Sequence, residues 1–466
     1  MAVFVAVLAE MGVFAIARQN SPISESSVLQ TGVVTPKVIC IGKPDQSYAV
    51  YLPSNYSADR KWPILYAFDP AARGVYPLER MKDAAERLGY IVVGSNNSRN
   101  GSWKMESEAA QAMFDDTHVR LAIDVRRLYF AGFSGGARLA SVIAQKCKCA
   151  AGVLLNGAGF SPGMPPSRDS AFPVFAGVGI FDFNYGEMSQ LQDQLEAQHF
   201  PHALRSFDGA HEWAPSPVMQ EAFDWFRVIA IKKGLEPPDD AFVAAQAQQS
   251  LDRARDLEHK GELFAAWREY HQAAEEFDVF PAATSLRKGA TSLESEKVVR
   301  DGAKRERQEI EEQSQLTQEI SAGMAALHDN GGARTDLRSD LERKIAILRD
   351  RSTREKRPEK QRVLRRALGG LLVQAIEGGE QPFEAKDFAL ARDYFQLAVA
   401  ADPASVWALE NLAVAQAQTG DHKAAIESLR RAREAAKDRA AFFAWVAKEE
   451  SFAKLRQEAQ FRALLN

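Results

Sequence analysis

Cysteine is scarce in this chain, with three residues among 466. No Cys/His cluster has the spacing of a zinc site, so we expect no metal ion, and no motif requires a cofactor. Cys147 and Cys149 lie so close together at one predicted helix end that we expect no disulfide between them. The cysteines therefore do not decide the compartment of the protein.

The chain also lacks an excess of charge of either sign. Lys and Arg number 58, and Asp and Glu number 62. This balance argues against nucleic acid or an anionic membrane surface as the partner. The hydrophobic share of 46% is typical of a soluble globular protein, and a length of 466 residues predicts two or three domains.

Long apolar runs are almost absent, and the one exception is residues 2–17. This segment is near the lower length limit for crossing a bilayer and contains Glu10. It ends in Ala15-Ile16-Ala17, which fits signal-peptide cleavage, although no Lys or Arg precedes it. We expect residues 1–17 to be a signal peptide or an N-terminal anchor of an exported protein, periplasmic or secreted. The alternative is a cytoplasmic or N-terminally anchored protein.

Between Val38 and Gly234, short apolar runs alternate with helical patterns. The predicted strands are 48–52, 62–68, 90–94, 128–131, 150–156, 172–177 and 203–207. Single helices between continuous apolar strands predict an α/β fold, with a mostly parallel sheet covered on both faces. In such sheets ligands bind at the carboxyl ends of the strands.

The most specific motif is Gly132-Phe133-Ser134-Gly135-Gly136. An apolar strand precedes it and a helix of small residues follows it. A sharp strand-to-helix turn needs residues without a β-carbon two before and two after the serine, because strand and helix come close there. Strand, G-x-S-x-G and helix together indicate a nucleophile elbow, with Ser134 as the nucleophile. The alternative is a glycine-rich turn with an idle serine.

A serine hydroxyl needs a base to remove its proton, and the base needs an acid to orient it. His211 stands in a loop after the last predicted strand, and Asp182 follows the strand before that. The order Ser134, Asp182, His211 is that of an α/β-hydrolase triad. Alternatively, His211 is an ordinary surface histidine. Asp182 could instead cap the helix that starts near Gly186. Asp208 is a rival acid, but it lies so near His211 that it would have to fold back sharply.

Residues 38–234 resemble the α/β-hydrolase superfamily, in its small esterase, dienelactone-hydrolase and polyester-depolymerase-like branch. The resemblance rests on the serine motif, on Asp182 in its loop, and on His211 followed by Glu212-Trp213. It implies a serine esterase that cleaves carboxylic esters through an acyl-enzyme. Ser134 would attack, His211 would move the proton, and Asp182 would hold the imidazole.

The resemblance also implies an oxyanion hole, with the amide of Gly135 as one donor. For the second donor this chain departs from the family pattern, because residues 67–74 replace the His-Gly that lipases and esterases often carry. Position 70 is a proline without an N–H, so the amide of Asp69 or Ala71 must serve. The alternative role of Asp69 is an ion pair with Arg73 that stiffens this loop.

Substrate contacts are expected from Phe133, Asn97, Arg99 and Trp213. Asn97 and Arg99 stand in the polar stretch 94–101, whose alternative is an ordinary surface loop. No long insertion interrupts this half of the chain. We therefore expect no cap over the acyl pocket from the catalytic domain itself.

Residues 235–240, with two prolines, are predicted to be a linker to an all-α domain at 241–466. Residues 391–398 have a small-large-small spacing that recurs 34 residues later at 425–432, with a third trace at 261–273. This period is similar to a degenerate tetratricopeptide array, and a generic helical bundle is the alternative. The array is expected to bind a protein partner or to self-associate.

Two functions remain. The first is a serine esterase with its catalytic domain at 18–234, and the alternative is an inactive hydrolase-fold scaffold that presents a helical-repeat surface. We favour the enzyme, because all three triad residue types stand in the right order. A catalytic domain of this size can bury its own core, so a chain of residues 18–233 is expected to fold and hydrolyse a small activated ester.

Overall fold

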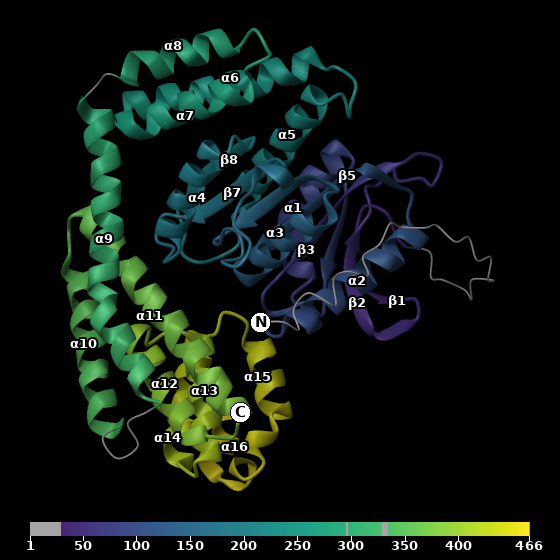
Figure 1. Ribbon diagram of the computed structural model, residues 1–466. Helices are drawn as coiled ribbons and strands as arrows, with labels where there is room; N and C mark the ends of the chain where they lie inside the picture. The colour runs from purple at the N-terminus through teal and green to yellow at the C-terminus, as the bar shows by residue number, and fades with distance from the viewer. Residues whose placement is uncertain (1–28, 295–296, 329–333, 466) are drawn as a thin grey trace. The chain divides into compact units, whose positions relative to one another are not determined.

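A computed structural model of the protein describes residues 29–294, 297–328 and 334–465, and Figure 1 shows its elements. The predicted N-terminal segment 1–17 lies outside the described residues. Within the described ranges, no helix is both long and apolar enough to span a membrane.

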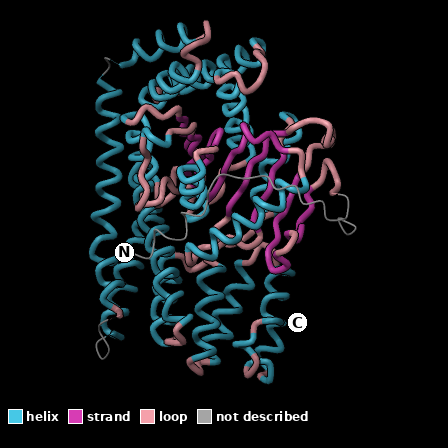
Figure 2. Tube along the Cα trace, turned by 45° about the vertical axis from the view of Figure 1, so that its right-hand side comes forward, coloured by secondary structure: helices cyan, strands magenta, loops and turns pink. Residues whose placement is uncertain are grey.

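An eight-stranded sheet forms the centre of the first half of the chain, in the order β1-β2-β4-β3-β5-β6-β7-β8 (Figure 2, magenta). Its strands are β1 Val34–Cys40, β2 Lys43–Tyr51, β3 Trp62–Phe68, β4 Ile91–Ser95, β5 Ile123–Phe133, β6 Ala150–Asn156, β7 Val174–Gly179 and β8 His202–Phe207. Strand β2 runs antiparallel to β1 and β4, while β4, β3, β5, β6 and β7 are parallel. This strand order is that of the α/β-hydrolase fold, and the predicted fold class is confirmed.

Helices cover both faces of the sheet. They are α1 Val75–Leu88, α2 Trp103–Arg120, α3 Gly135–Cys147, α4 Tyr185–Ala197 and α5 Ser216–Lys232. Alternation along β3 separates the faces: Leu65 and Ala67 join the core formed with α1 and α5, whereas the ring of Tyr66 stacks on Phe114 of α2 at 4.4 Å. Each central strand is therefore buried on both sides, as its continuous apolar sequence predicts.

Contacts between residues divide the chain into two compact units. The first consists of residues up to 178, 187–207 and 212–299. The second consists of 179–186, 208–211 and 300–466. The short loops that follow β7 and β8 therefore belong with the C-terminal helices, and the helices just after the predicted linker belong with the sheet. The two units do not divide at the predicted linker.

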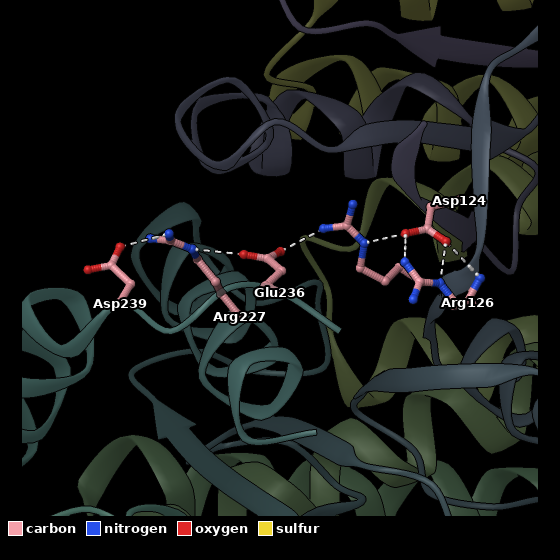
Figure 3. A network of polar contacts seen from close by, with 6 residues as sticks. Asp124, Arg126, Arg227, Glu236 and Asp239 are labelled. Carbon is pink, nitrogen blue, oxygen red and sulfur yellow. Dashed lines mark hydrogen bonds and ion pairs between the residues drawn. The ribbon is translucent and has the colours of Figure 1, made fainter. Parts of the chain in front are cut away.

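The predicted linker is held to the first unit by a chain of ion pairs (Figure 3). The Glu236 carboxylate accepts from Arg127 of β5 at 2.7 Å and from Arg227 of α5 at 3.2 Å. Arg227 also donates to Asp239 at 2.9 Å. Helices α6 Asp240–His259, α7 Leu263–Glu276 and α8 Ala283–Glu294 follow. The charged residues on both sides of the two prolines thus hold this segment in place.

A buried arginine joins these helices to strand β8. Arg205 is 8% exposed, and its guanidinium donates to Glu221 of α5 at 2.5 Å and to Gln272 of α7 at 2.7 Å. Glu269 of α7 adds an ion pair at 3.7 Å. Burial raises the pKa of the nearby Glu276 to about 8, and the neighbouring carboxylates add to the rise while Arg205 opposes it.

Replacing Glu276 by glutamine is expected to flatten the pH dependence of stability. The folded-state pKa of about 8 lies above the ordinary value of 4.5, so the folded chain binds this proton more tightly than the unfolded chain. The stabilisation is complete below the ordinary pKa and is lost as pH rises through the folded-state pKa. Glutamine cannot ionise, so the variant should melt like wild type near pH 4 and roughly several degrees higher near pH 8.5. Melting curves of Glu276→Gln and of the exposed neighbour Glu275→Gln would test this, and equal pH slopes in wild type and Glu276→Gln would contradict it.

The described residues of the second unit from 300 onward form helices joined by short connections. Its helices are α9 Lys297–Ala326, α10 Arg334–Arg354, α11 Pro358–Glu384, α12 Phe388–Ala401, α13 Val406–Gln418, α14 His422–Ala435, α15 Arg439–Lys448 and α16 Ala459–Leu465, of which α9 begins three residues before the unit does. Helix α11 packs on α12, and α13 packs on α14. The small and large positions of the predicted repeat are buried in one core: Ala391, Phe395, Ala398, Ala425, Leu429 and Ala432.

The starts of α12 and α14 repeat the same local structure 34 residues apart. Lys386 and Gly420 both have left-handed backbone, with φ of 63° and 83°. The next residues, Asp387 and Asp421, cap the helices by accepting from main-chain amides at 3.0 and 3.2 Å. The repeat is therefore present in the backbone as well as in the sequence.

Cys147 and Cys149 form a disulfide, so the prediction that they would not pair is wrong. The reason is the residue between them. Lys148 has a left-handed φ of 52° and ends α3, and the two Cα atoms lie 5.1 Å apart, within the range of a disulfide. A continuing helix would point the two side chains in nearly opposite directions, because successive residues are about 100° apart around the axis.

Candidate active site

Ser134 stands in a strained turn between β5 and α3. Its backbone has φ 53° and ψ −122°, and its N–H donates to the carbonyl of Asn156 on β6 at 2.9 Å. A residue other than glycine at positive φ costs about 1–3 kcal/mol, and such residues are concentrated at functional sites. The neighbouring strand and the helix hold the serine in this conformation.

The glycines on either side are required by close backbone contacts. A β-carbon on Gly132 would overlap the carbonyl of Gly136, and one on Gly136 would overlap the carbonyl of Phe68. Neither position has room for a side chain. The close approach of backbone segments, which the sequence motif predicts, explains the glycine at both positions.

Asn100, which the sequence alone did not single out, lies beside the first amide of α3. A β-carbon on Gly135 would overlap the side-chain oxygen of Asn100, so the Asn100 amide group lies against this predicted oxyanion donor. Of the two candidates for the second donor, the N–H of Ala71 donates to the Asp69 carboxylate at 2.9 Å. The main-chain amide of Asp69 is the remaining one.

The Asp69 side chain is fully buried and is the centre of a hydrogen-bond cluster. It accepts two bonds from the Arg73 guanidinium, both at 2.9 Å, and one from the Trp213 indole at 2.8 Å. The predicted Asp69–Arg73 pair is present. Trp213 is 2% exposed and its ring lies 5.9 Å from that of Phe133, which is also buried. Both aromatic residues therefore support the site from within the core, and their burial does not favour the predicted contact with substrate.

The two polar residues predicted to contact substrate, Asn97 and Arg99, stand in the loop after β4. The Asn97 side chain accepts from the Ser47 N–H at 2.8 Å and donates to the Asp45 carbonyl at 3.0 Å, which fixes the start of β2. Arg99 is exposed, and its backbone forms a bridge with Ala71. For Asn97 the contacts favour the alternative of a structural loop residue.

The predicted acid and base are brought together in the second unit. His211 Nδ1 lies 2.9 and 3.1 Å from the two carboxylate oxygens of Asp182, whose side chain is fully buried. The N–H of Asn184 donates to the same carboxylate at 2.8 Å. Because Nδ1 donates to Asp182, Nε2 is the basic nitrogen of the neutral ring, which is the tautomer that a general base requires.

Main-chain bonds fold the two loops of this unit onto each other. The N–H of Phe181 donates to the carbonyl of Gly209 in the other loop at 2.9 Å. Within its own loop, the N–H of Asp182 donates to the carbonyl of Gly179 at 3.0 Å. The ring of Phe183 lies 4.4 Å from the His211 imidazole. We call residues 179–186 the acid loop. Its turn and its contact with the histidine ring limit the orientations of both side chains.

The three predicted triad residues follow three strands of one sheet. Ser134 directly follows β5, the acid loop begins at the last residue of β7, and His211 stands four residues after β8. Ser134 belongs to the first unit, and the Asp182–His211 pair belongs to the second. The described part of the chain has no group of three or more His, Cys, Asp or Glu side chains arranged to hold a metal ion.

Comparison with known proteins gives one sequence match and several similar folds. A family model described as tetratricopeptide repeat matches residues 383–448. No sequence among the curated proteins matches the chain. Similar solved structures include fluorophosphonate-binding serine hydrolase F of Staphylococcus aureus with bound substrate, at 14% identity and a TM-score of 0.34, covering 39% of this chain and 92% of that one.

Two further structures are of the same kind. An S-formylglutathione hydrolase of Staphylococcus aureus has 13% identity and a TM-score of 0.35, covering 43% of this chain and 99% of that one. Esterase 2 of Thermogutta terrifontis, phosphonylated by sarin, has 12% identity and a TM-score of 0.34, covering 42% and 92%. Similarity at this level carries no information about substrate, and the fold is assigned from the strand order and the elbow. The chain joins an α/β-hydrolase fold to a C-terminal helical region that matches the tetratricopeptide repeat.

Proposed function

We propose that the protein is a serine hydrolase that cleaves carboxylic esters. The observation that best supports this is the fully buried Asp182 carboxylate bonded to Nδ1 of His211, because this bond holds the tautomer that a general base requires. The strained elbow at Ser134 supplies the nucleophile that such a pair would serve.

The reaction follows from these groups. Nε2 of His211 accepts the proton of Ser134 Oγ as this oxygen attacks the ester carbonyl carbon. The tetrahedral intermediate then collapses, the bond to the alcohol oxygen breaks, and the imidazolium returns the proton to that oxygen. A water molecule repeats the sequence on the acyl-enzyme, releasing the acid and restoring Ser134. Asp182 stays ionised and stabilises the imidazolium.

Backbone amides would stabilise the negative charge that forms on the carbonyl oxygen. The N–H of Gly135 at the start of α3 is the first donor, and we propose the N–H of Asp69 as the second, because the N–H of Ala71 is already bonded. The buried cluster of Asp69, Arg73 and Trp213 would keep this second amide in place.

The helical region supports a second part of the proposal. Its tetratricopeptide match suggests that a protein partner or another copy of the chain binds there. The alternative for the whole protein is an inactive scaffold. Labelling with a fluorophosphonate probe distinguishes the two, because an active serine hydrolase reacts once at its nucleophile and a scaffold does not react.

Replacing Asp182 by asparagine is expected to lower kcat by about 10²-fold or more, because the amide cannot stabilise the imidazolium and permits the wrong tautomer. Folding should change little, since the two side chains have the same shape. Turnover of p-nitrophenyl acetate and thermal melting would check this, with Asp208→Asn as the matched control. An unchanged rate in Asp182→Asn together with a collapse in Asp208→Asn would assign the acid role to Asp208.

A further inference from the structure

The acid loop is held from outside by side chains of α9 and α11. The carbonyl of Ile180 accepts from Arg366 Nε of α11 at 2.7 Å, and that of Phe183 accepts from Gln313 Nε2 of α9 at 2.8 Å. These two carbonyls lie on either side of Asp182 in the chain. Both ends of the short segment that carries the candidate acid are therefore hydrogen-bonded to the helical region.

Aromatic residues of the same loop add contacts with these helices. The Arg366 guanidinium lies 3.7 Å from the centre of the Tyr185 ring. The Arg365 guanidinium lies 3.4 Å from the centre of the Phe181 ring. The Tyr185 hydroxyl donates to Glu306 of α9 at 2.7 Å. Arg366 is buried and Arg365 is exposed, so the contact of Arg366 with Tyr185 is expected to be the stronger of the two.

Arg366 is a buried charge whose acidic partner is distant. It is 2% exposed, and its ion pair with Glu309 has a separation of 3.6 Å. Burial lowers the pKa of its guanidinium despite the acidic and aromatic neighbours. An arginine buried at this cost is weakly explained by stability alone, since an apolar residue would often serve better. Its directed bond to Ile180 and its stacking on Tyr185 offer a specific reason for the residue.

We propose that Arg366 is a positioning residue for the candidate acid. It fixes the backbone before Asp182 and the ring after it, so that the carboxylate keeps its geometry with His211. This inference rests on the proposed function for its catalytic meaning. It makes the helical region part of the catalytic machinery, whereas the tetratricopeptide match alone would suggest only a binding surface.

The expected size follows from the precision that catalysis needs. A displacement of about 1 Å in a catalytic group can cost about 10²-fold in rate. In Arg366→Gln the loop keeps its own main-chain bonds, so a loss of about 10- to 100-fold in kcat is expected. KM for a small ester should change by less than about threefold, because no group that binds it is removed.

Arg362 provides a matched control. It lies one turn earlier on α11 and pairs with the same Glu309, at 2.9 Å. Among the described residues, no hydrogen bond or ring contact joins it to the acid loop. Arg362→Gln should therefore keep kcat within about twofold of wild type. Melting of both variants would show how much stability each arginine contributes.

A double-mutant cycle separates positioning from general stability. In an Asp182→Asn background, Arg366→Gln should cause no further loss in kcat, because the carboxylate that it positions is gone. Should Arg366→Gln fail to fold, Gln313→Leu removes the bond on the other side of Asp182 and takes its place in the cycle. An unchanged kcat in the single variant, or an equal loss in both backgrounds, would overturn the inference.

A spectroscopic measurement tests the inference without turnover. The proton NMR signal of the His211 Nδ1–H should move in Arg366→Gln and stay in place in Arg362→Gln. If the full-length wild type neither hydrolyses esters nor reacts with fluorophosphonate but this signal moves, the proposed function fails and the positioning role stands. If wild type is active and Arg366→Gln matches it in both rate and signal, the positioning role fails.

Discussion

Replacing Ser134 by alanine is expected to remove ester hydrolysis, with a loss of about 10³-fold or more in kcat. The hydroxyl oxygen forms the bond to the acyl carbon, and no chain neighbour can replace it because Phe133 and Gly135 carry no nucleophilic group. Any residual rate would come from the oxyanion donors alone. Folding should change little, since alanine has the same difficulty as serine at a φ of 53°.

The measurement is turnover of p-nitrophenyl acetate, together with labelling by a fluorophosphonate probe and thermal melting. Ser107→Ala, at a half-buried position of α2, is the control and should keep full activity and labelling. A Ser134→Ala variant that keeps most of its activity would show that the elbow is not the nucleophile. A wild-type chain that is neither active nor labelled would favour the scaffold.

Strands buried on both faces were predicted best. Strands β3 and β6 have the predicted bounds, because each is a continuous apolar run with turn residues at its ends. Strand β1 was missed. Its sequence includes Pro36 and Lys37, and it is half exposed at the edge of the sheet, where neither alternation nor an apolar run is required.

The start of α2 shows a similar limit. The small apolar residues indicate a helix only from about Ala109, but the observed one begins at Trp103, after the cap provided by Ser102. Its first two turns are largely polar and partly exposed, so they have no apolar stripe. The cap is a local signal that could have located this start.

The candidate acid and base were predictable because each follows a strand end and the chain order is informative. The residues that support them were not. Trp213 meets Asp69 across 144 positions of sequence, and Arg366 meets Ile180 across 186. Contacts this distant have no local pattern. Trp213 stands two residues after His211 and was therefore expected to contact substrate, whereas it is buried and bonded to Asp69.

The contacts of the acid loop argue against the sequence-based expectation that residues 18–233 would be an active enzyme, and lead to the opposite prediction. A chain that ends at residue 233 loses the bonds of Arg366 and Gln313 to the loop. It also loses Gln272 and Glu269, which bind the buried Arg205. Of the acidic partners given above for Arg205, Glu221 remains. Removing partners of a buried charge destabilises a protein by about 3–5 kcal/mol.

A chain that ends at residue 299 separates these two losses, because it keeps α6 to α8 and the partners of Arg205. We expect it to be soluble and to keep the circular dichroism of its sheet and helices, but to hydrolyse p-nitrophenyl acetate about 10³-fold more slowly than the full chain, since Asp182 and His211 both lose their support. The chain ending at 233 should be inactive and also less soluble. Turnover of the 299-residue chain close to that of the full chain would mean that the main-chain bond between Phe181 and Gly209 is enough to orient the pair. The helical region would then act through its binding surface alone.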